Sequence, residues 1–155
     1  MNWLTVGRNF LVYTGCPGAG KTYFCYALLN YIKDSSLKRT YRYWNERSLL
    51  SAVRASMEQT KGDFRDQLKY LIDDHFLIID DLGSSGYTDW RRDIIFDLID
   101  IRYESTLPTV FTSNLNRDQM LSNFGERAHG RLFATENTFL ESYGTDYRQS
   151  HKNNG

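Results

Sequence analysis

The sequence has few cysteines and prolines, no excess of either charge and no long hydrophobic run. Nineteen basic residues balance nineteen acidic ones, so we expect any DNA binding to come from a local patch or from assembly and not from overall charge. Two cysteines are too few for a disulfide framework, and we expect a reducing, cytoplasmic location. No apolar run approaches the ~20 residues that a membrane-spanning helix needs. The N-terminus lacks the basic and apolar regions of a signal peptide, so we expect no membrane partner.

The length and composition predict one globular domain. A chain of 155 residues fits a single domain covering 1–155. Its content of 41% hydrophobic and 25% charged residues is ordinary for a protein with a packed core. We expect the core to span about residues 9–148 and a polar C-terminal tail to follow at 149–155.

Short apolar runs alternate with segments of helical periodicity. The runs predict strands at 9–14, 40–44, 76–81, 109–113 and 138–141, and the periodic segments predict helices at 21–33, 46–59, 63–73, 90–104, 117–123 and 126–132. In the helix at 46–59, Leu49, Leu50, Val53 and Met57 form one stripe that we expect to face the core. The alternation predicts an α/β fold, with a mostly parallel central sheet and helices on both of its faces.

A phosphate-binding loop follows the first predicted strand. The stretch matches the P-loop pattern G-x-x-x-x-G-K-[ST] in full, with Gly15, Cys16, Pro17, Gly18, Ala19, Gly20, Lys21 and Thr22. Backbone N–H groups of such a loop point at phosphates, Lys21 adds a positive charge and the Thr22 hydroxyl is a ligand for Mg²⁺. We therefore predict that residues 15–22, with the adjacent Tyr23, bind the phosphates of a nucleoside triphosphate. A glycine-rich turn before an ordinary helix is the alternative, and the strand-loop-helix context disfavours it.

Two carboxylates end the buried run at 76–81. Carboxylates at the C-terminal edge of a parallel sheet lie in the crevice where ligands bind, so Asp80 is a candidate Mg²⁺ ligand. Asp81 is a candidate for orienting the attacking water, with capping of the next turn as its alternative role. An aspartate is one methylene shorter than the glutamate that many such enzymes use, which leaves the rate of hydrolysis open.

Three further polar residues are candidates for catalysis. Asn114 ends the strand at 109–113, and its amide can bond a phosphate or the water; a loop-forming role is the alternative. Arg127 and Arg131 are four residues apart and share a helix face. One of the two is expected to act in trans as an arginine finger in a neighbouring subunit. A surface charge pair beside Glu126 is the alternative.

These motifs resemble those of the ATPase domain of DnaC-type helicase loaders and of the related IstB transposition ATPases, over about residues 9–148. Residues 77–83 are similar to the family's Walker B motif and 112–114 to its sensor 1. Residues 125–127, with Arg131 and Leu132, are similar to its arginine-finger segment, which implies that the finger is Arg127 and leaves Arg131 as the alternative. Tyr147 and Arg148 resemble its terminal aromatic-Arg signature. The resemblance implies an AAA+ P-loop NTPase of the ASCE type without a separate C-terminal lid. It also implies an ATP-dependent homo-oligomer with Mg²⁺ as cofactor.

The resemblance further implies partners and leaves alternatives open. Single-stranded DNA and a replicative helicase or transposase are the implied partners, with the helix at 46–59 facing the DNA. The family's N-terminal partner-binding region has no counterpart before residue 9. We therefore expect that partner binding lies elsewhere, that a second chain supplies it, or that the chain is a stand-alone relative with another task. A second hypothesis is an ATP-gated adaptor that hydrolyses little. A small-molecule P-loop kinase ranks last, because no arginine-rich lid is visible between Gly62 and Asp74.

Overall fold

The computed structural model describes residues 10–35, 39–59, 63–86 and 88–143. Strands and helices alternate along this part of the chain, as the sequence predicts. In order, they are β1 (Phe10–Gly15), α2 (Lys21–Asp34), β2 (Tyr41–Asn45), α3 (Glu46–Gln59), α4 (Phe64–Ile72), β3 (Phe76–Asp80), α5 (Asp89–Glu104), β4 (Thr109–Ser113), α6 (Arg117–Leu132) and β5 (Thr138–Ser142).

The five strands form one parallel sheet in the order β2-β3-β4-β1-β5. Every residue of β3 and β4 is buried, which explains why both read as continuous apolar runs rather than as alternating patterns. Parallel strands place all their C-terminal ends at one edge. The order therefore brings together the ends of β1, β3 and β4, and with them the loop after Gly15, Asp80 and Asn114.

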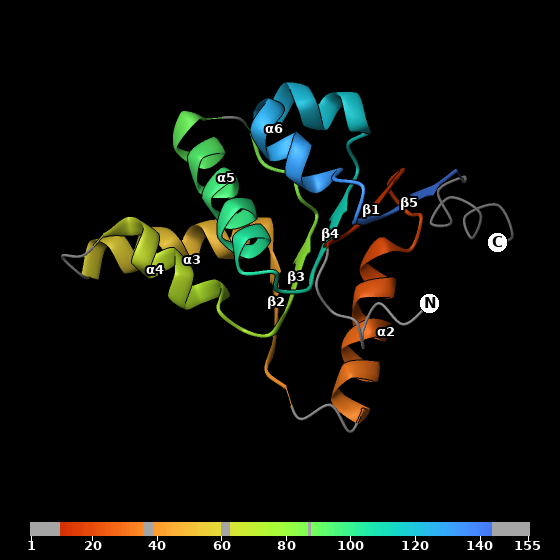
Figure 1. Cartoon of the computed structure of the whole chain (residues 1–155), viewed down its shortest axis with the longest axis horizontal. Helices are drawn as coiled ribbons and strands as arrows, with labels where there is room; N and C mark the ends of the chain where they lie inside the picture. Colours follow the sequence, from red (N-terminus) through yellow and green to blue (C-terminus); the bar gives the residue numbers. More distant parts are fainter. Residues whose placement is uncertain (1–9, 36–38, 60–62, 87, 144–155) are drawn as a thin grey trace, which may run out of the picture.

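Helices cover both faces of the sheet, as predicted. On one face, α2 packs over Leu11 and Ile78 and contributes Cys25 to a small apolar cluster. On the other face, α3 to α6 enclose the larger core around Ile79 and Phe111. Figure 1 shows α2 on one side of the strands and α3, α5 and α6 on the opposite side. No helix in the described ranges is both long and apolar enough to cross a membrane.

The helices match their predicted bounds closely, whereas one residue that was predicted to face the core does not. Gly125 has φ 82° inside α6 and breaks it, at the position where the sequence predicts one helix to end and another to begin. A side chain is strained at such an angle, which favours glycine there. The prediction for Met57 is wrong, because its side chain is 43% exposed. It lies near the end of α3, which extends away from the sheet in Figure 1.

A fully buried arginine ties the N-terminal ends of β3 and β4 together. Arg102 of α5 has no exposed surface, and burial lowers the pKa of its guanidinium to about 9. It donates to backbone carbonyls in the segments that precede β3 and β4 and to one hydroxyl. The acceptors are the carbonyls of Ile72, Asp74, His75 and Pro108 and Oγ1 of Thr109. Arg102 thus fixes the edge of the sheet opposite to the P-loop.

Candidate nucleotide-binding site

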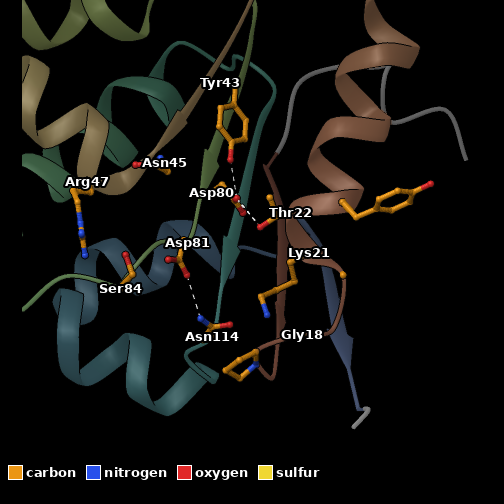
Figure 2. A pocket seen from close by; sticks show the side chains of 13 residues that line it. Gly18, Lys21, Thr22, Tyr43, Asn45, Arg47, Asp80, Asp81, Ser84 and Asn114 are labelled. Carbon is orange, nitrogen blue, oxygen red and sulfur yellow. Dashed lines mark hydrogen bonds between the residues drawn. The ribbon is translucent and has the colours of Figure 1, made fainter. Parts of the chain in front are cut away.

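A cavity of about 640 Å³ opens at the C-terminal edge of the sheet. This volume is in the usual range for sites that enclose small molecules. Its wall comes from the loop after β1, the start of α2, the ends of β2 and β3, and the residues that follow β3 and β4 (Figure 2). The lining residues are Pro17, Gly18, Gly20, Lys21, Thr22, Tyr23, Tyr43, Asn45, Arg47, Asp80, Asp81, Ser84 and Asn114.

The loop after β1 has the shape that phosphate binding requires. Gly18 and Gly20 have φ angles of 82° and 81°, a region that other residues enter only with strain. Lys21 is only 7% exposed, and its Nζ donates to the carbonyls of Gly15 and Cys16 at 2.7 Å each. Gly20, the N-cap of α2, has no side chain to bond the first N–H groups of the helix. The positive end of α2 is therefore available to an anion in the cavity. The residues therefore fit the phosphates of a nucleotide.

The remaining loop residues support this shape from outside the cavity. A β-carbon on Gly15 would collide with Ser142, so the close approach of β5 requires glycine at that position. The Ala19 N–H donates to the Cys16 carbonyl at 3.2 Å. Tyr23 borders the cavity but is 80% exposed.

Asp80 is surrounded by hydrogen-bond donors at the centre of the sheet edge. The hydroxyls of Thr22 and Tyr43 donate to its Oδ2 at 2.9 and 2.8 Å, as Figure 2 shows. The Thr112 hydroxyl donates to Oδ1, and Sγ of Cys25 lies 3.8 Å from the same oxygen. Burial and the nearby carboxylate raise the pKa of Cys25 and of Tyr43, so both keep their protons and remain donors.

The contact of Thr22 with Asp80 fits a magnesium ion. Mg²⁺ prefers oxygen ligands and is usually held by one or two carboxylates together with phosphates and waters. A P-loop hydroxyl and one strand-end carboxylate within 2.9 Å of each other offer two such oxygens beside the cavity. Both residues were singled out from the sequence, and the structure brings them together.

Asp81 and Asn114 also lie together, as their strand order predicts. Nδ2 of Asn114 donates to Oδ1 of Asp81 at 3.1 Å, and both residues border the cavity (Figure 2). Asp81 has φ 60°, a left-handed angle that aspartate adopts more readily than most residues. Its N–H donates to Oγ1 of Thr112 at 3.0 Å, which holds this turn in place.

The candidate finger residues lie on α6, outside the cavity of their own chain. Arg131 forms an ion pair with the buried Asp100 and lies 3.9 Å from Glu104. Arg127 is exposed and stacks its guanidinium over Phe96 at 4.8 Å from the ring centroid. Of the two arginines, Arg127 is therefore the more accessible to a second molecule. Tyr147 and Arg148 lie outside the described residues.

Four cavity residues were not among those that the sequence predicts for the nucleotide site. Tyr43 and Asn45 belong to β2, Arg47 is the second residue of α3, and Ser84 follows β3. A usable signal was available for β2, because the ends of all parallel strands meet at the ligand-binding edge. Asn45 pairs in register with Asp80, so its strand position placed it beside the metal site.

A buried ion pair supports the loop that carries Ser84. Glu46, the first residue of α3, is fully buried, forms an ion pair with Arg91 of α5 and accepts a hydrogen bond from the Gly83 N–H. Arg91 also donates to the Gly86 carbonyl at 2.6 Å. Burial raises the pKa of Glu46, and the Gly83 N–H and the Arg91 charge oppose that rise.

A second cavity, of about 460 Å³, lies between α3 and the loop after β3. We call it the α3 groove. Its wall combines arginines, hydroxyls and one tryptophan with the apolar side of α3. The lining residues are Arg47, Leu50, Ser51, Arg54, Ala55, Glu58, Ser85, Gly86, Thr88, Trp90 and Arg91. The guanidinium of Arg54 lies 4.9 Å from the centroid of the Trp90 ring.

Comparison with protein families gives one match that covers most of the chain. Residues 1–133 match the family described as IstB-like ATP binding protein. Two curated relatives are helicase loaders. The replicative helicase loader DnaI of Bacillus subtilis is 27% identical over 124 residues, and DnaC of Buchnera aphidicola is 28% identical over 151 residues. These alignments cover 76% and 92% of this chain but only 37% and 58% of the relatives.

Solved structures give the same fold. A crystal structure of the DnaC helicase loader is 27% identical, with a TM-score of 0.75 over 88% of this chain and 80% of that chain. The replication initiator DnaA, bound to AMPPCP and single-stranded DNA, is 17% identical. It has a TM-score of 0.70 over 88% of this chain and 41% of that one. The five-stranded parallel sheet with its flanking helices is thus the fold of AAA+ P-loop domains.

Proposed function

The chain belongs to the family of IstB-like ATP-binding proteins, and we propose that it hydrolyses ATP with Mg²⁺ as an oligomer on single-stranded DNA. The observation that carries the proposal is the 2.9 Å contact between the Thr22 hydroxyl and Asp80. It joins the P-loop to the acidic strand end, which are the two halves that a magnesium-nucleotide site needs. Binding of ATP is a property of the family; hydrolysis, metal use and DNA are the parts that we propose.

Each polar residue of the cavity has a role in this proposal. The loop amides and Lys21 hold the phosphates, and Thr22 and Asp80 hold Mg²⁺, which neutralises charge on the phosphate oxygens when bound. Asp81 orients the attacking water and accepts its proton. Asn114 fixes the Asp81 carboxylate through their 3.1 Å hydrogen bond. The chemistry is mainly positioning and charge stabilisation, so small displacements of these groups lower the rate.

A second subunit completes the site. We infer that Arg127 of one chain reaches the cavity of its neighbour and stabilises the charge of the transition state. Its exposure on α6 supports this role, whereas the ion pair of Arg131 with Asp100 holds that side chain within its own chain. Hydrolysis then depends on assembly, because a single chain lacks the finger at its own cavity.

The names of the relatives suggest the setting of this activity. Both curated relatives named above are replicative helicase loaders, so a replicative helicase is one candidate partner. A transposase, which the resemblance in sequence implies, is another. The α3 groove supplies a local patch for single-stranded DNA, since Arg47 and Arg54 offer two cations on a chain of zero net charge. The alignments cover only 37% and 58% of those relatives, so partner choice also stays a proposal.

A specific observation favours a second candidate function. Asp81 is a short acid held at φ 60° and hydrogen-bonded by Asn114. A carboxylate held this way can fail to reach the water, and the protein would then bind ATP without turning it over. In that case ATP would gate the binding of a protein partner, and phosphate release would be negligible at every protein concentration.

Phosphate release separates these functions. Turnover should be measured at saturating ATP and several protein concentrations, with and without single-stranded DNA, for the wild type, Lys21→Ala and Lys33→Ala. Lys33 is the matched control, because it is exposed in the last turn of α2, away from the cavity. We expect turnover per subunit to rise with concentration and DNA, to vanish in Lys21→Ala and to persist in Lys33→Ala. Tight ATP binding with flat, negligible turnover would support the adaptor instead.

A further inference from the structure

Arg47 borders both cavities of the protein. It is the one residue that lines the nucleotide cavity as well as the α3 groove, among the residues that the structure describes. Its side chain is exposed, and no hydrogen bond or ion pair within the described ranges engages its guanidinium. In Figure 2 it extends from the first turn of α3 along the wall beside Ser84. An uncommitted cation therefore stands between two sites that both suit anions.

The wall around Arg47 is firmly held. The loop after β3 faces the nucleotide cavity through Ser84 and the groove through Ser85. The fully buried Glu46 anchors this loop through the Gly83 N–H and ties α3 to α5 through Arg91. Displacing the wall would break a buried ion pair and leave a charge without its partner, which is costly. The side chain of Arg47 is accordingly the part of the wall that can change its position at low cost.

The groove has the chemistry of a phosphodiester site. Arg54 supplies a second cation, and Ser51, Ser85 and Thr88 supply hydroxyl donors. Guanidinium groups and hydroxyls are the usual donors to the phosphates of nucleic acids. Glu58 is the one acid among the lining residues, and Glu46 offsets the charge of Arg91. The two remaining arginines still outnumber the single acid, so the groove carries a net positive charge.

We propose that ATP and a single-stranded nucleic acid compete for Arg47, so that nucleotide binding removes one phosphate contact from the α3 groove. This inference rests on the proposed function. When the Arg47 guanidinium pairs with a nucleotide phosphate, it is not available to a phosphate in the groove. When it pairs with a phosphate in the groove, it is not available to the nucleotide. Linkage makes the effect reciprocal, since each ligand weakens the other by the same factor. The protein thereby loosens its hold on DNA within one subunit when the triphosphate binds and regains it after release.

The size of the effect follows from one lost contact. The free energy of the lost contact should lie between that of an exposed ion pair and that of a buried charged hydrogen bond. ATP should therefore weaken oligonucleotide binding about three- to tenfold. Each phosphate contact to a single strand contributes about 0.7 to the slope of log affinity against log salt concentration. The slope should therefore become shallower by about 0.7 when a nucleotide occupies the cavity.

The test measures this slope with labelled hexathymidylate, a probe too short to join several subunits. Affinity is titrated against salt at constant Mg²⁺, with and without a saturating non-hydrolysable ATP analogue. The variants are Arg47→Gln, Arg47→Lys and Arg54→Gln; both arginines are exposed, so the fold should survive. Arg54 lines the groove and not the nucleotide cavity, which makes it the matched control.

We expect the nucleotide to change the slope in the wild type and in Arg47→Lys, which keeps the charge. Arg47→Gln should give one shallow slope in both states. Arg54→Gln should lower both slopes and keep their difference. Equal slopes in the wild type, a difference that persists in Arg47→Gln, or no binding of the probe would each overturn the inference. Analogue affinity and ATP turnover, measured on the same samples, report separately on the proposed function.

Discussion

Replacing Arg102 with Met should destabilise the protein strongly. The side chain is completely buried and donates five hydrogen bonds, four of them to backbone carbonyls. Methionine fills a similar volume but leaves these acceptors without a donor at the base of β3 and β4. Leaving one buried acceptor without its donor costs about 1–3 kcal/mol, so losing several such donors at once should cost about 3–5 kcal/mol. That is a large part of the ~5–15 kcal/mol that holds a domain folded.

Thermal and urea unfolding would measure this loss. A destabilisation of about 4 kcal/mol lowers the Tm of a domain of this size by roughly 8–16 °C. Arg92→Met is the matched control, because Arg92 is exposed on the same helix and makes one 3.2 Å hydrogen bond to the Asn123 carbonyl. Arg102→Lys, which keeps the charge but has fewer donors in another geometry, should fall between the two. An Arg102→Met protein within about 1 kcal/mol of the wild type would refute the reasoning.

Three other perturbations have defined outcomes. Asp80→Asn should weaken Mg²⁺-dependent ATP binding on the order of tenfold or more, because it removes a charged metal ligand. Titrating ATP with and without Mg²⁺ measures this effect, and an unchanged dependence on Mg²⁺ would count against the metal site. Gly125→Ala should lower the free energy of unfolding by about 1 kcal/mol, because φ is 82° there and no neighbour lies near enough to compensate, whereas Gly130→Ala, inside regular helix, should not. Burial, Arg39 and Arg102 lower the pKa of His75 below 6.5. The unfolded chain therefore binds this proton more readily, so stability should fall as the pH drops below 6.5, and His75→Gln should lose that part of the pH dependence in urea titrations.

Much of the fold could be predicted because local signals agreed with the topology. The predicted bounds of α3 and β4 match the structure residue for residue, and the break at Gly125 was visible as a glycine between two helical patterns. The adjacency of Asp81 and Asn114 followed from the strand order of a parallel sheet. These features depend on periodicity and on glycine chemistry, which a single sequence carries in full.

The buried charges could not be predicted in the same way. Charged residues are rarely buried, so Arg102, Glu46 and Arg91 look like ordinary surface residues of amphipathic helices. Their burial depends on acceptors far away in the sequence. The position of Arg47 between two cavities has the same origin, because it depends on how α3 lies against the loop after β3. Met57 shows the opposite failure, since its helical spacing was right but α3 extends beyond the core there.

A mixing experiment tests the central claim, that two chains together form a site that hydrolyses ATP. Lys21→Ala keeps its finger but loses its phosphate site, and Arg127→Ala keeps its site but lacks the finger. Each variant alone should release almost no phosphate, and Arg117→Ala, an exposed arginine on the same helix α6, should behave like the wild type. An equal mixture should recover a measurable part of wild-type turnover, because some interfaces then join an intact site to an intact finger. A mixture no more active than the two variants apart, beside an active wild type, would contradict the account.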